Sequence, residues 1–126
     1  MTKIVKVKTG SKLEEISSYS RLVCVDNWIF VSNTAGRNPE TKEIPEDVLE
    51  QTHQVFSNVE AALKAVGASL ADVVMSRVFI QNPADTQAVM TVTCPPLGST
   101  IYKMELEVTA FRGASSAEIE VINTAN

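Results

Sequence analysis

The stretch that most constrains this chain is residues 101–110, where apolar and charged side chains alternate. In an extended strand, successive side chains point to opposite faces. The apolar face would hold Met104, Leu106 and Val108, and the charged face Lys103, Glu105 and Glu107. Carboxylates are poor strand formers and are costly to bury unpaired, so the charged face should lie in water or line a polar cleft between subunits. The second arrangement would be a functional site.

Length and composition indicate one domain over residues 1–126. A chain of 126 residues, 44% hydrophobic and 21% charged, is an ordinary globular sequence with enough apolar residues for one core. No apolar run approaches the length of a membrane span, and the N-terminal residues alternate instead of forming a signal peptide. We therefore expect a cytoplasmic protein without a membrane partner, whose cysteines Cys24 and Cys94 stay reduced.

The charge makes nucleic acid an unlikely partner. Fifteen acidic and eleven basic residues give a formal charge of -4, which offers little attraction to a phosphate backbone. Four lysines do gather near the N-terminus, at Lys3, Lys6, Lys8 and Lys12. On a predicted strand over residues 4–8, they are typical of an edge that avoids pairing with other edges. The single histidine, His53, is expected at the surface and builds no convincing metal site or catalytic triad.

A hairpin and a long helix can be predicted from local signals. Two β-rich runs, Leu22 to Val25 and Trp28 to Ser32, flank Asp26-Asn27, a pair that closes hairpins. Residues 44–47 then carry the proline and acids of a helix start, and apolar residues recur every three or four positions until Gly67.

The second half of the chain is less regular. Residues 70–80 predict a strand, and residues 85–90 the first turns of a second helix capped by Asn82 or Asp85. A run of strand-forming residues then begins at Thr91, with no turn residue between it and the predicted helix. Residues 117–122 would form either an edge strand or an ordered tail. This order predicts an α+β fold in which helices cover one face of a mixed sheet, and the other face requires a partner, most simply a second copy of the chain.

Several segments together resemble the RidA (YjgF-type) family. The resemblance covers most of residues 17–110 and depends on the order and spacing of its pieces. These are Tyr19-Ser20-Arg21, Trp28-Ile29-Phe30-Val31-Ser32, Asn38-Pro39-Glu40-Thr41, Glu50-Gln51-Thr52, Asn58-Val59, Gly67 to Val74 and Arg77-Val78-Phe79-Ile80. It implies a chorismate-mutase-like fold and a homotrimer with clefts between adjacent subunits. It also implies small carboxylate-bearing ligands, no cofactor or metal and, in active members, hydrolysis of 2-imino or enamino acids to 2-oxo acids and ammonia.

The resemblance assigns the candidate site residues. Glu105 matches the family glutamate that positions or activates water, Tyr19 matches the site tyrosine, and Ser32-Asn33 match a Ser-Gly pair. Thr91 begins the strand that follows the family's carboxylate-binding arginine, and it is grouped with the ligand-binding residues. A competing alignment sets Glu118 against the family glutamate and Lys103 against the arginine. We prefer Glu105, which makes residues 112–126 a C-terminal extension.

Two departures from the family pattern lie at the junction of Met90 and Thr91. Met90 stands where the family has an asparagine, and no arginine stands directly before Thr91. A helix-sized piece of about 11 residues or more is missing at this junction, either by deletion or because residues are omitted. The cation could instead come from Arg21, Arg37, Arg77 or Arg112, although a surface or interface ion pair is the usual role of such residues. Arg77 ranks first because it adjoins apolar Val78 and Phe79 on a strand.

The leading hypothesis is a RidA-like trimer that binds small carboxylate metabolites between its subunits and hydrolyses imines. One alternative is a non-catalytic ligand-sensing or interaction protein on the same scaffold. An endoribonuclease is a further alternative, which the acidic charge and the lack of a histidine pair disfavour.

Overall fold

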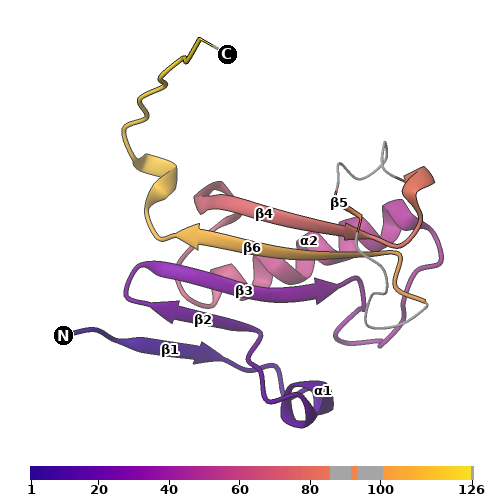
Figure 1. The fold of residues 1–126 in the computed structure, drawn as a ribbon. Coiled ribbons are helices and arrows are strands. Elements are labelled where there is room, and N and C mark those ends of the chain that lie inside the picture. The colour runs from indigo at the N-terminus through magenta and orange to yellow at the C-terminus, as the bar shows by residue number, and fades with distance from the viewer. Residues whose placement is uncertain (86–91, 94–100, 126) are drawn as a thin grey trace.

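A six-stranded mixed sheet forms the centre of the protein (Figure 1). The structure is a computed structural model that describes residues 1–85, 92–93 and 101–125, with only the backbone described at 92 and 93. In chain order the strands are β1 (Ile4–Val7), β2 (Leu22–Val25), β3 (Trp28–Ala35), β4 (Val73–Ile80), β5 (Val92–Thr93) and β6 (Met104–Phe111). Their order in the sheet is β1-β2-β3-β6-β4-β5, and β4 with β5 is the parallel pair. The predicted α+β class with a mixed sheet is confirmed.

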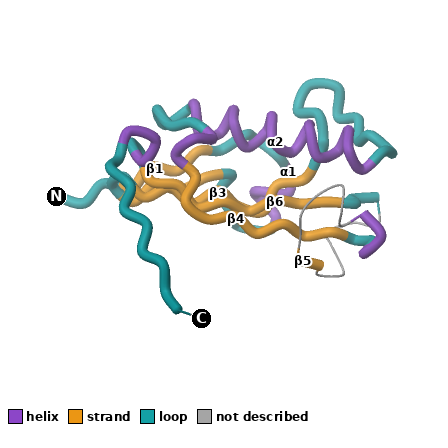
Figure 2. The backbone as a smooth tube through the Cα atoms, turned by 90° about the horizontal axis from the view of Figure 1, so that it is seen from above, coloured by secondary structure: helices purple, strands orange, loops and turns teal. Residues whose placement is uncertain are grey.

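One long helix, α2 (Val48–Lys64), lies along one face of this sheet, as Figure 2 shows. It begins where the sequence predicted, because the side chain of Asp47 accepts a hydrogen bond from the backbone N–H of Glu50 at 3.1 Å. The remaining helical pieces are short. They are α1 (Lys12–Ile16) and the 3-10 turns η1 (Leu70–Asp72), η2 (Pro83–Asp85) and η3 (Ala114–Ser116).

The core lies between α2 and the sheet. Alternation along the strands turns one set of side chains toward the helix, and helix residues spaced three or four apart pack against them. The fully buried members include Leu22, Ile29, Val31, Val55, Val59, Leu63, Met104 and Leu106. Each such side chain contributes about 1.5–3 kcal/mol when it leaves water. The predicted apolar face of residues 101–110 is confirmed, since Met104, Leu106 and Val108 are all buried.

The opposite face of the sheet carries large apolar side chains that nothing in the described residues covers. Trp28 and Phe30 on β3 are 48% and 46% exposed. The Trp28 ring meets the Phe111 ring edge-on, with centroids 4.9 Å apart. An exposed apolar surface on a sheet is typical of an interaction face. This is the face for which the sequence required a partner.

The hairpin prediction is also confirmed. β2 and β3 pair antiparallel through the Asp26-Asn27 turn, where Asp26 has φ of 53°. The Asp26 carboxylate accepts the backbone N–H of Lys3 at 2.9 Å, which ties the turn to the start of β1.

The structure contains one helix that was not predicted, and two local predictions differ from it in part. The chain after Gly10 forms the helix α1, which has only five residues and therefore too few turns for a periodic signal. The predicted strand over residues 70–80 is wrong at its start, because Ser69 and Asp72 form a capping box around η1. Of the two forms expected for residues 117–122, the edge strand is wrong because the segment pairs with no described strand, and the segment is an extended tail. η2 ends at Asp85, and the rest of the predicted second helix lies outside the described residues.

Asp72 fixes the junction between η1 and η3. Its Oδ1 accepts the backbone N–H of Ser115 at 2.9 Å and its Oδ2 accepts that of Ser69 at 3.0 Å. These hydrogen bonds, with the Ser115 backbone as the largest contribution, lower the pKa of Asp72 from its usual 3.8. Among the described residues, no helix has both the length and the apolar character needed to cross a membrane.

Candidate functional site

Glu105 lies at the start of β6 on the sheet face opposite the core, yet it is only 9% exposed. Its Oε2 accepts a hydrogen bond from Asn33 Nδ2 at 3.0 Å. The register between β3 and β6 shifts between Val31 and Thr34, and such an irregularity re-aims the side chains at that point. The shift allows Asn33 to reach across to the carboxylate.

Arg21, at the start of β2, binds the same part of β3. Its Nη1 donates to the carbonyl oxygen of Asn33 at 3.0 Å and to Thr34 Oγ1 at 2.8 Å. Asn33 therefore bonds to Arg21 through its backbone and to Glu105 through its side chain. One arginine and one carboxylate are thus linked by a single residue of the irregular β3 segment.

Tyr19 and Ser32 lie beside the same arginine. Arg21 Nη2 donates to Tyr19 Oη at 3.1 Å, and the guanidinium carbon is 5.4 Å from the centroid of the tyrosine ring. Ser32 Oγ donates to the carbonyl oxygen of Ser20 at 2.6 Å. The structure thus places Tyr19, Ser32, Asn33 and Glu105 at one end of the sheet. Arg21 connects Tyr19 with Asn33, and the Asn33 side chain connects this group with Glu105.

Glu14 is a further member of this cluster that the sequence did not single out. It is 2% exposed, its Oε2 accepts the backbone N–H of Thr9 at 3.0 Å, and its Oε1 lies 4.0 Å from Arg21 Nε. Within the described residues, Oε1 has no hydrogen-bond partner. A buried carboxylate beside an arginine helps to hold that side chain in place and balances its charge. No periodic pattern marks Glu14, because it lies on the five-residue α1.

Gln51 sets the position of the chain that leads into β6. This fully buried side chain donates from Nε2 to the carbonyl oxygens of Pro45 at 2.6 Å and Ile101 at 3.1 Å. Its Oε1 accepts the backbone N–H of Lys103 at 3.0 Å. Because Lys103 is two residues before Glu105, these hydrogen bonds from α2 help to fix the position of the Glu105 backbone.

The other arginines have different surroundings. Arg77, ranked first from the sequence, has a 61% exposed side chain and lies 3.8 Å from Glu107 Oε1. Arg37 donates to the carbonyl oxygen of Lys42 in the loop after β3. Arg112 follows β6 and binds the β2–β3 hairpin, donating from Nη1 to the Asp26 carbonyl oxygen and to Asn27 Oδ1, both at 3.1 Å.

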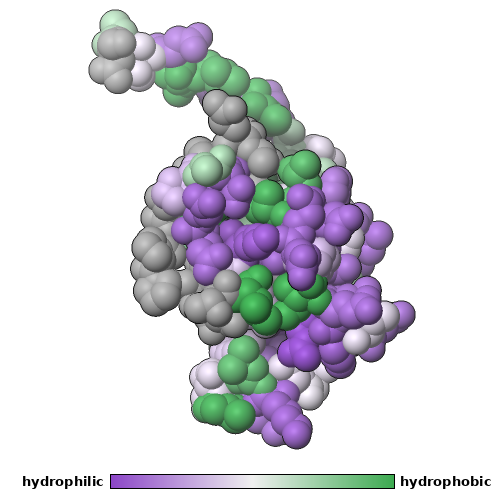
Figure 3. All heavy atoms as spheres, turned by 90° about the vertical axis from the view of Figure 1, so that its right-hand side faces the viewer, coloured by the Kyte–Doolittle hydropathy of each residue, from purple (hydrophilic) through white to green (hydrophobic). Residues whose placement is uncertain are grey.

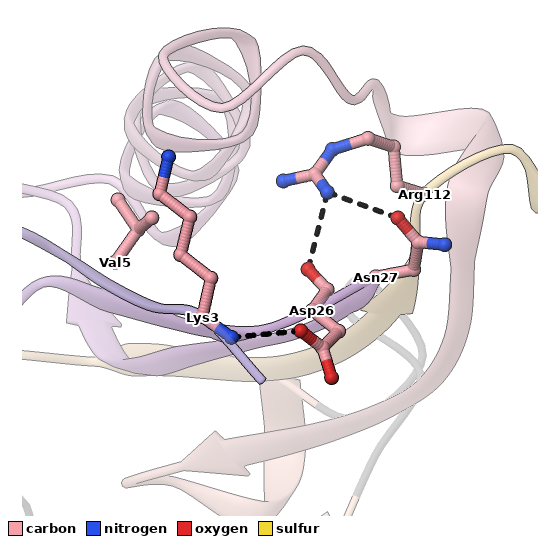
Figure 4. Close-up of a pocket in the computed structure, with 5 residues that line it drawn as sticks. All are labelled: Lys3, Val5, Asp26, Asn27 and Arg112. Carbon is pink, nitrogen blue, oxygen red and sulfur yellow. Dashed lines mark hydrogen bonds between the residues drawn. The ribbon is translucent and has the colours of Figure 1, made fainter. Parts of the chain in front are cut away.

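Figure 4 shows the hollow that surrounds Arg112. It is open to solvent and lined by Lys3, Val5, Asp26, Asn27 and Arg112. Since Arg112 and Glu105 adjoin opposite ends of the eight-residue β6, they are separated by a strand length of about 23 Å. The hollow is therefore separate from the Glu105 cluster.

The remaining predicted residues lie elsewhere in the structure or outside its described part. Thr91, Met90 and Cys94 lie outside the described residues. Glu118, the alternative to Glu105, is exposed in the C-terminal segment, and His53 is exposed on α2 as predicted. In the described ranges, no three His, Cys, Asp or Glu residues are grouped as a metal site would require.

Comparison with known proteins shows the family. A family model described as Endoribonuclease L-PSP matches residues 9–125, and the chain belongs to this family, which includes the YjgF/RidA proteins. A RutC family protein of Pyrococcus abyssi is 42% identical over 71 residues, which cover 56% of each chain. The 2-iminobutanoate/2-iminopropanoate deaminase of Dermatophagoides farinae is 34% identical over 87 residues, or 68% of each chain. The chain thus spans little more than half of the first relative and about two thirds of the second.

Solved structures show the same fold. Rv2704 of Mycobacterium tuberculosis, described as a member of the YjgF/YER057c/UK114 family, has a TM-score of 0.74 and 26% identity. The alignment covers 86% of this chain and 99% of Rv2704. TdcF of Escherichia coli, solved with bound serine, has a TM-score of 0.67 and 26% identity over 75% of this chain and 88% of its own. The chorismate-mutase-like fold that the sequence resemblance implied is confirmed.

Proposed function

We propose that this chain hydrolyses small 2-imino or enamino acids to 2-oxo acids and ammonia, at clefts between the subunits of a homotrimer. The observation that carries the proposal is Glu105, a largely buried carboxylate that points away from the core and is oriented by Asn33. The deaminase name of one relative and the bound serine in TdcF support a small carboxylate-bearing substrate.

Glu105 has the chemistry that imine hydrolysis needs. Water must add to the carbon of the C=N bond, and the nitrogen must then leave as ammonia. A carboxylate that accepts the water proton and returns a proton to the departing nitrogen serves both steps, so that the reaction consumes one water and forms one C=O bond. The Asn33 amide holds Glu105 Oε2 in one orientation, which favours this proton transfer.

Arg21 is the cation that we assign to the substrate carboxylate. It lies beside Tyr19, Asn33 and the buried Glu14, whereas the Arg77 side chain is largely exposed beside Glu107. One of its two Nη2 hydrogens bonds Tyr19, and the other has no partner among the described residues. A guanidinium can bind a carboxylate bidentately through two parallel N–H donors, a planar geometry that a lysine ammonium does not offer. This assignment places the positive charge directly before β2 and not in the chain before Thr91.

The homotrimer is part of the proposal because the cluster lies at the edge of an uncovered sheet face. Trp28 and Phe30 supply the apolar surface of that face, and a second copy packed on it would also enclose the neighbouring Glu105 end. Enclosure excludes water other than the reacting molecule and strengthens the charge interactions inside the cleft.

The experiment is a turnover assay with 2-iminopropanoate generated in the same tube. The trimer fraction from a sizing column is added, and pyruvate and ammonia are followed against buffer alone. We expect release of both products in equal amounts and faster than in buffer. A folded trimer that gives no acceleration would rule out the deaminase activity.

A further inference from the structure

The C-terminal segment, residues 117–125, leaves the body of the protein in an extended form (Figure 1). Its side chains are exposed, including Ile119 at 81%, Val121 at 75% and Ile122 at 76%. Figure 3 shows that hydrophobic residues of this segment stand off the rest of the surface. Glu118 to Val121 alternate acid and apolar residues as a strand does, yet no described strand pairs with them. The segment has the pattern of a strand but lacks a sheet.

The sheet offers an open edge at β1, which is the outermost strand on its side. Arg21 N donates to Val7 O and Asp26 N donates to Lys3 O, both at 3.0 Å, so the odd-numbered residues turn their backbone groups toward β2. The N–H and C=O groups of Ile4 and Lys6 consequently point to the open side. Such an edge can accept one more strand.

An antiparallel register matches the two sequences at every position. With Glu120 opposite Lys6, the flanking pairs are Ile122 with Ile4, Val121 with Val5, Ile119 with Val7 and Glu118 with Lys8. Apolar residues meet apolar residues, and each acid meets a lysine, which is the favourable arrangement across strands. Lys8 Nζ already donates to the Tyr19 carbonyl oxygen at 2.6 Å, so Glu120 and Lys6 form the decisive pair.

The position of the segment indicates that the accepting β1 belongs to another copy. The Ser115 N–H bond to Asp72 holds η3 beside the start of β4, and β2, β3 and β6 separate β4 from β1. Figures 1 and 2 show the segment running away from its own β1, on the side of the sheet opposite α2. The same side carries the uncovered Trp28 and Phe30, where a second copy would lie.

We propose that residues 118–122 of one copy add as an antiparallel strand to β1 of a second copy, with Glu120 opposite Lys6. Strand addition supplies main-chain hydrogen bonds, and the alternating side chains supply the specificity. The lysines of β1 then have two effects. They repel an identical basic edge, and they attract the acidic segment.

Disulfide trapping between two singly substituted chains tests this directly. Lys6→Cys carrying one affinity tag is mixed with Glu120→Cys carrying another, and the mixture is unfolded and refolded together before mild oxidation. Opposed strand residues lie within disulfide reach, with Cα atoms about 5.5 Å apart. We expect a disulfide between the two differently tagged chains to form at least about fivefold faster than in a control mixture of Lys12→Cys with Glu120→Cys.

Equal rates in the two mixtures would overturn the proposal. So would a doubly substituted Lys6→Cys/Glu120→Cys chain that forms only an intrachain disulfide, because that result places the segment on its own β1. Wild-type protein under the same oxidation measures any background from Cys24 and Cys94.

Amide hydrogen exchange provides a second readout that leaves the cysteines unchanged. In the proposed register, the amides of Glu118, Glu120 and Ile122 face β1 and exchange slowly, whereas those of Ile119 and Val121 stay fast. Lys6→Glu should speed the slow amides about fivefold or more, and Lys6→Glu/Glu120→Lys should restore slow exchange. Uniformly fast exchange in the wild-type protein would contradict the proposal.

Discussion

The two ends of the uncovered sheet face share the strands β3 and β6 but differ in chemistry. At one end, Asn33 links Arg21 to Glu105 through directed hydrogen bonds. At the other, Trp28 and Phe111 meet edge to face with no charged side chain between them. Directed polar contacts suit one ligand geometry, whereas an apolar surface suits association over an area. One pair of strands therefore carries a polar cluster and an apolar surface about one strand length apart.

The largest effect should come from removing the carboxylate at the polar end. Glu105→Gln keeps the shape and the Asn33 side of the cluster but cannot accept a proton, so we expect a loss in kcat of about 10²–10⁴-fold. Glu107→Gln is the matched control on the same face of β6, and its effect should be small because Glu107 contacts exposed Arg77. Steady-state ammonia release measures both. Equal losses in kcat for the two variants would contradict the special role that we assign to Glu105.

A matched pair of variants also distinguishes the two candidate cations, Arg21 and Arg77. Arg21→Gln should raise KM by about 10–100-fold, because a hydrogen bond to a charged group contributes about 1.5–3 kcal/mol. Arg77→Gln should leave KM nearly unchanged, since the Arg77 side chain is 61% exposed. If Arg77→Gln has the larger effect on KM, then Arg77 binds the substrate carboxylate instead.

The apolar end should govern assembly. Trp28→Asp places a charge in the proposed subunit contact and should weaken association at least about tenfold, given the loss of apolar burial. Ile16→Asp is the control, because Ile16 is an 80% exposed apolar residue on α1 and not on the sheet. Sedimentation velocity over a concentration series gives the comparison. A Trp28→Asp protein that assembles like the wild type would show that this face is not the contact.

Gly36 lies just after β3 and tests how the helix supports both ends. A Cβ at this position would meet the Gln51 carbonyl oxygen at 2.5 Å, so α2 or the end of β3 must move in Gly36→Ala. We expect a loss of about 1–3 kcal/mol in the free energy of unfolding, measured by urea denaturation. An unchanged urea midpoint would show that β3 and α2 can move apart at this contact without a loss of stability.

The smallest effect concerns the acid limb of stability. Because the pKa of Asp72 is lowered in the folded protein, the ionised carboxylate stabilises the fold above about pH 3.8. This contribution is lost as the pH falls from 3.8 through the lower pKa that Asp72 has in the folded protein. Asp72→Asn should therefore flatten the fall in unfolding free energy over that range. An identical slope in both proteins would contradict the assignment.

The sequence predicted most of the fold because its signals are local and regular. The alternation at Met104 to Val108 and the cap at Asp47 each determine one element without reference to distant residues. α1 escaped prediction because five residues make too short a pattern, and η1 did because the Ser69 and Asp72 capping box overrides β-rich neighbours. Local reasoning therefore works where an element is long enough to repeat.

The candidate site was harder to predict, because it depends on tertiary contacts. Family resemblance supplied Tyr19, Ser32, Asn33 and Glu105, but it could not show that Asn33 bonds to Glu105 across 72 positions. Strand neighbours made Arg77 seem the leading cation, yet its side chain turns to the exposed face. The role of Arg21 depends on the irregular segment of β3, and no sequence spacing encodes that contact.

Ligand-dependent NMR on the assembled protein tests most directly whether the ligand binds at the Asn33 and Arg21 end of the sheet. Pyruvate, the 2-oxo acid that the proposed reaction would release, is added while the Asn33 side-chain amide, the Arg21 Nε–H and the Trp28 indole N–H are observed. We expect saturable shifts of the Asn33 and Arg21 signals, with the Trp28 signal unchanged. Shifts confined to Trp28, with Asn33 and Arg21 unaffected, would place the ligand at the apolar end and contradict this expectation.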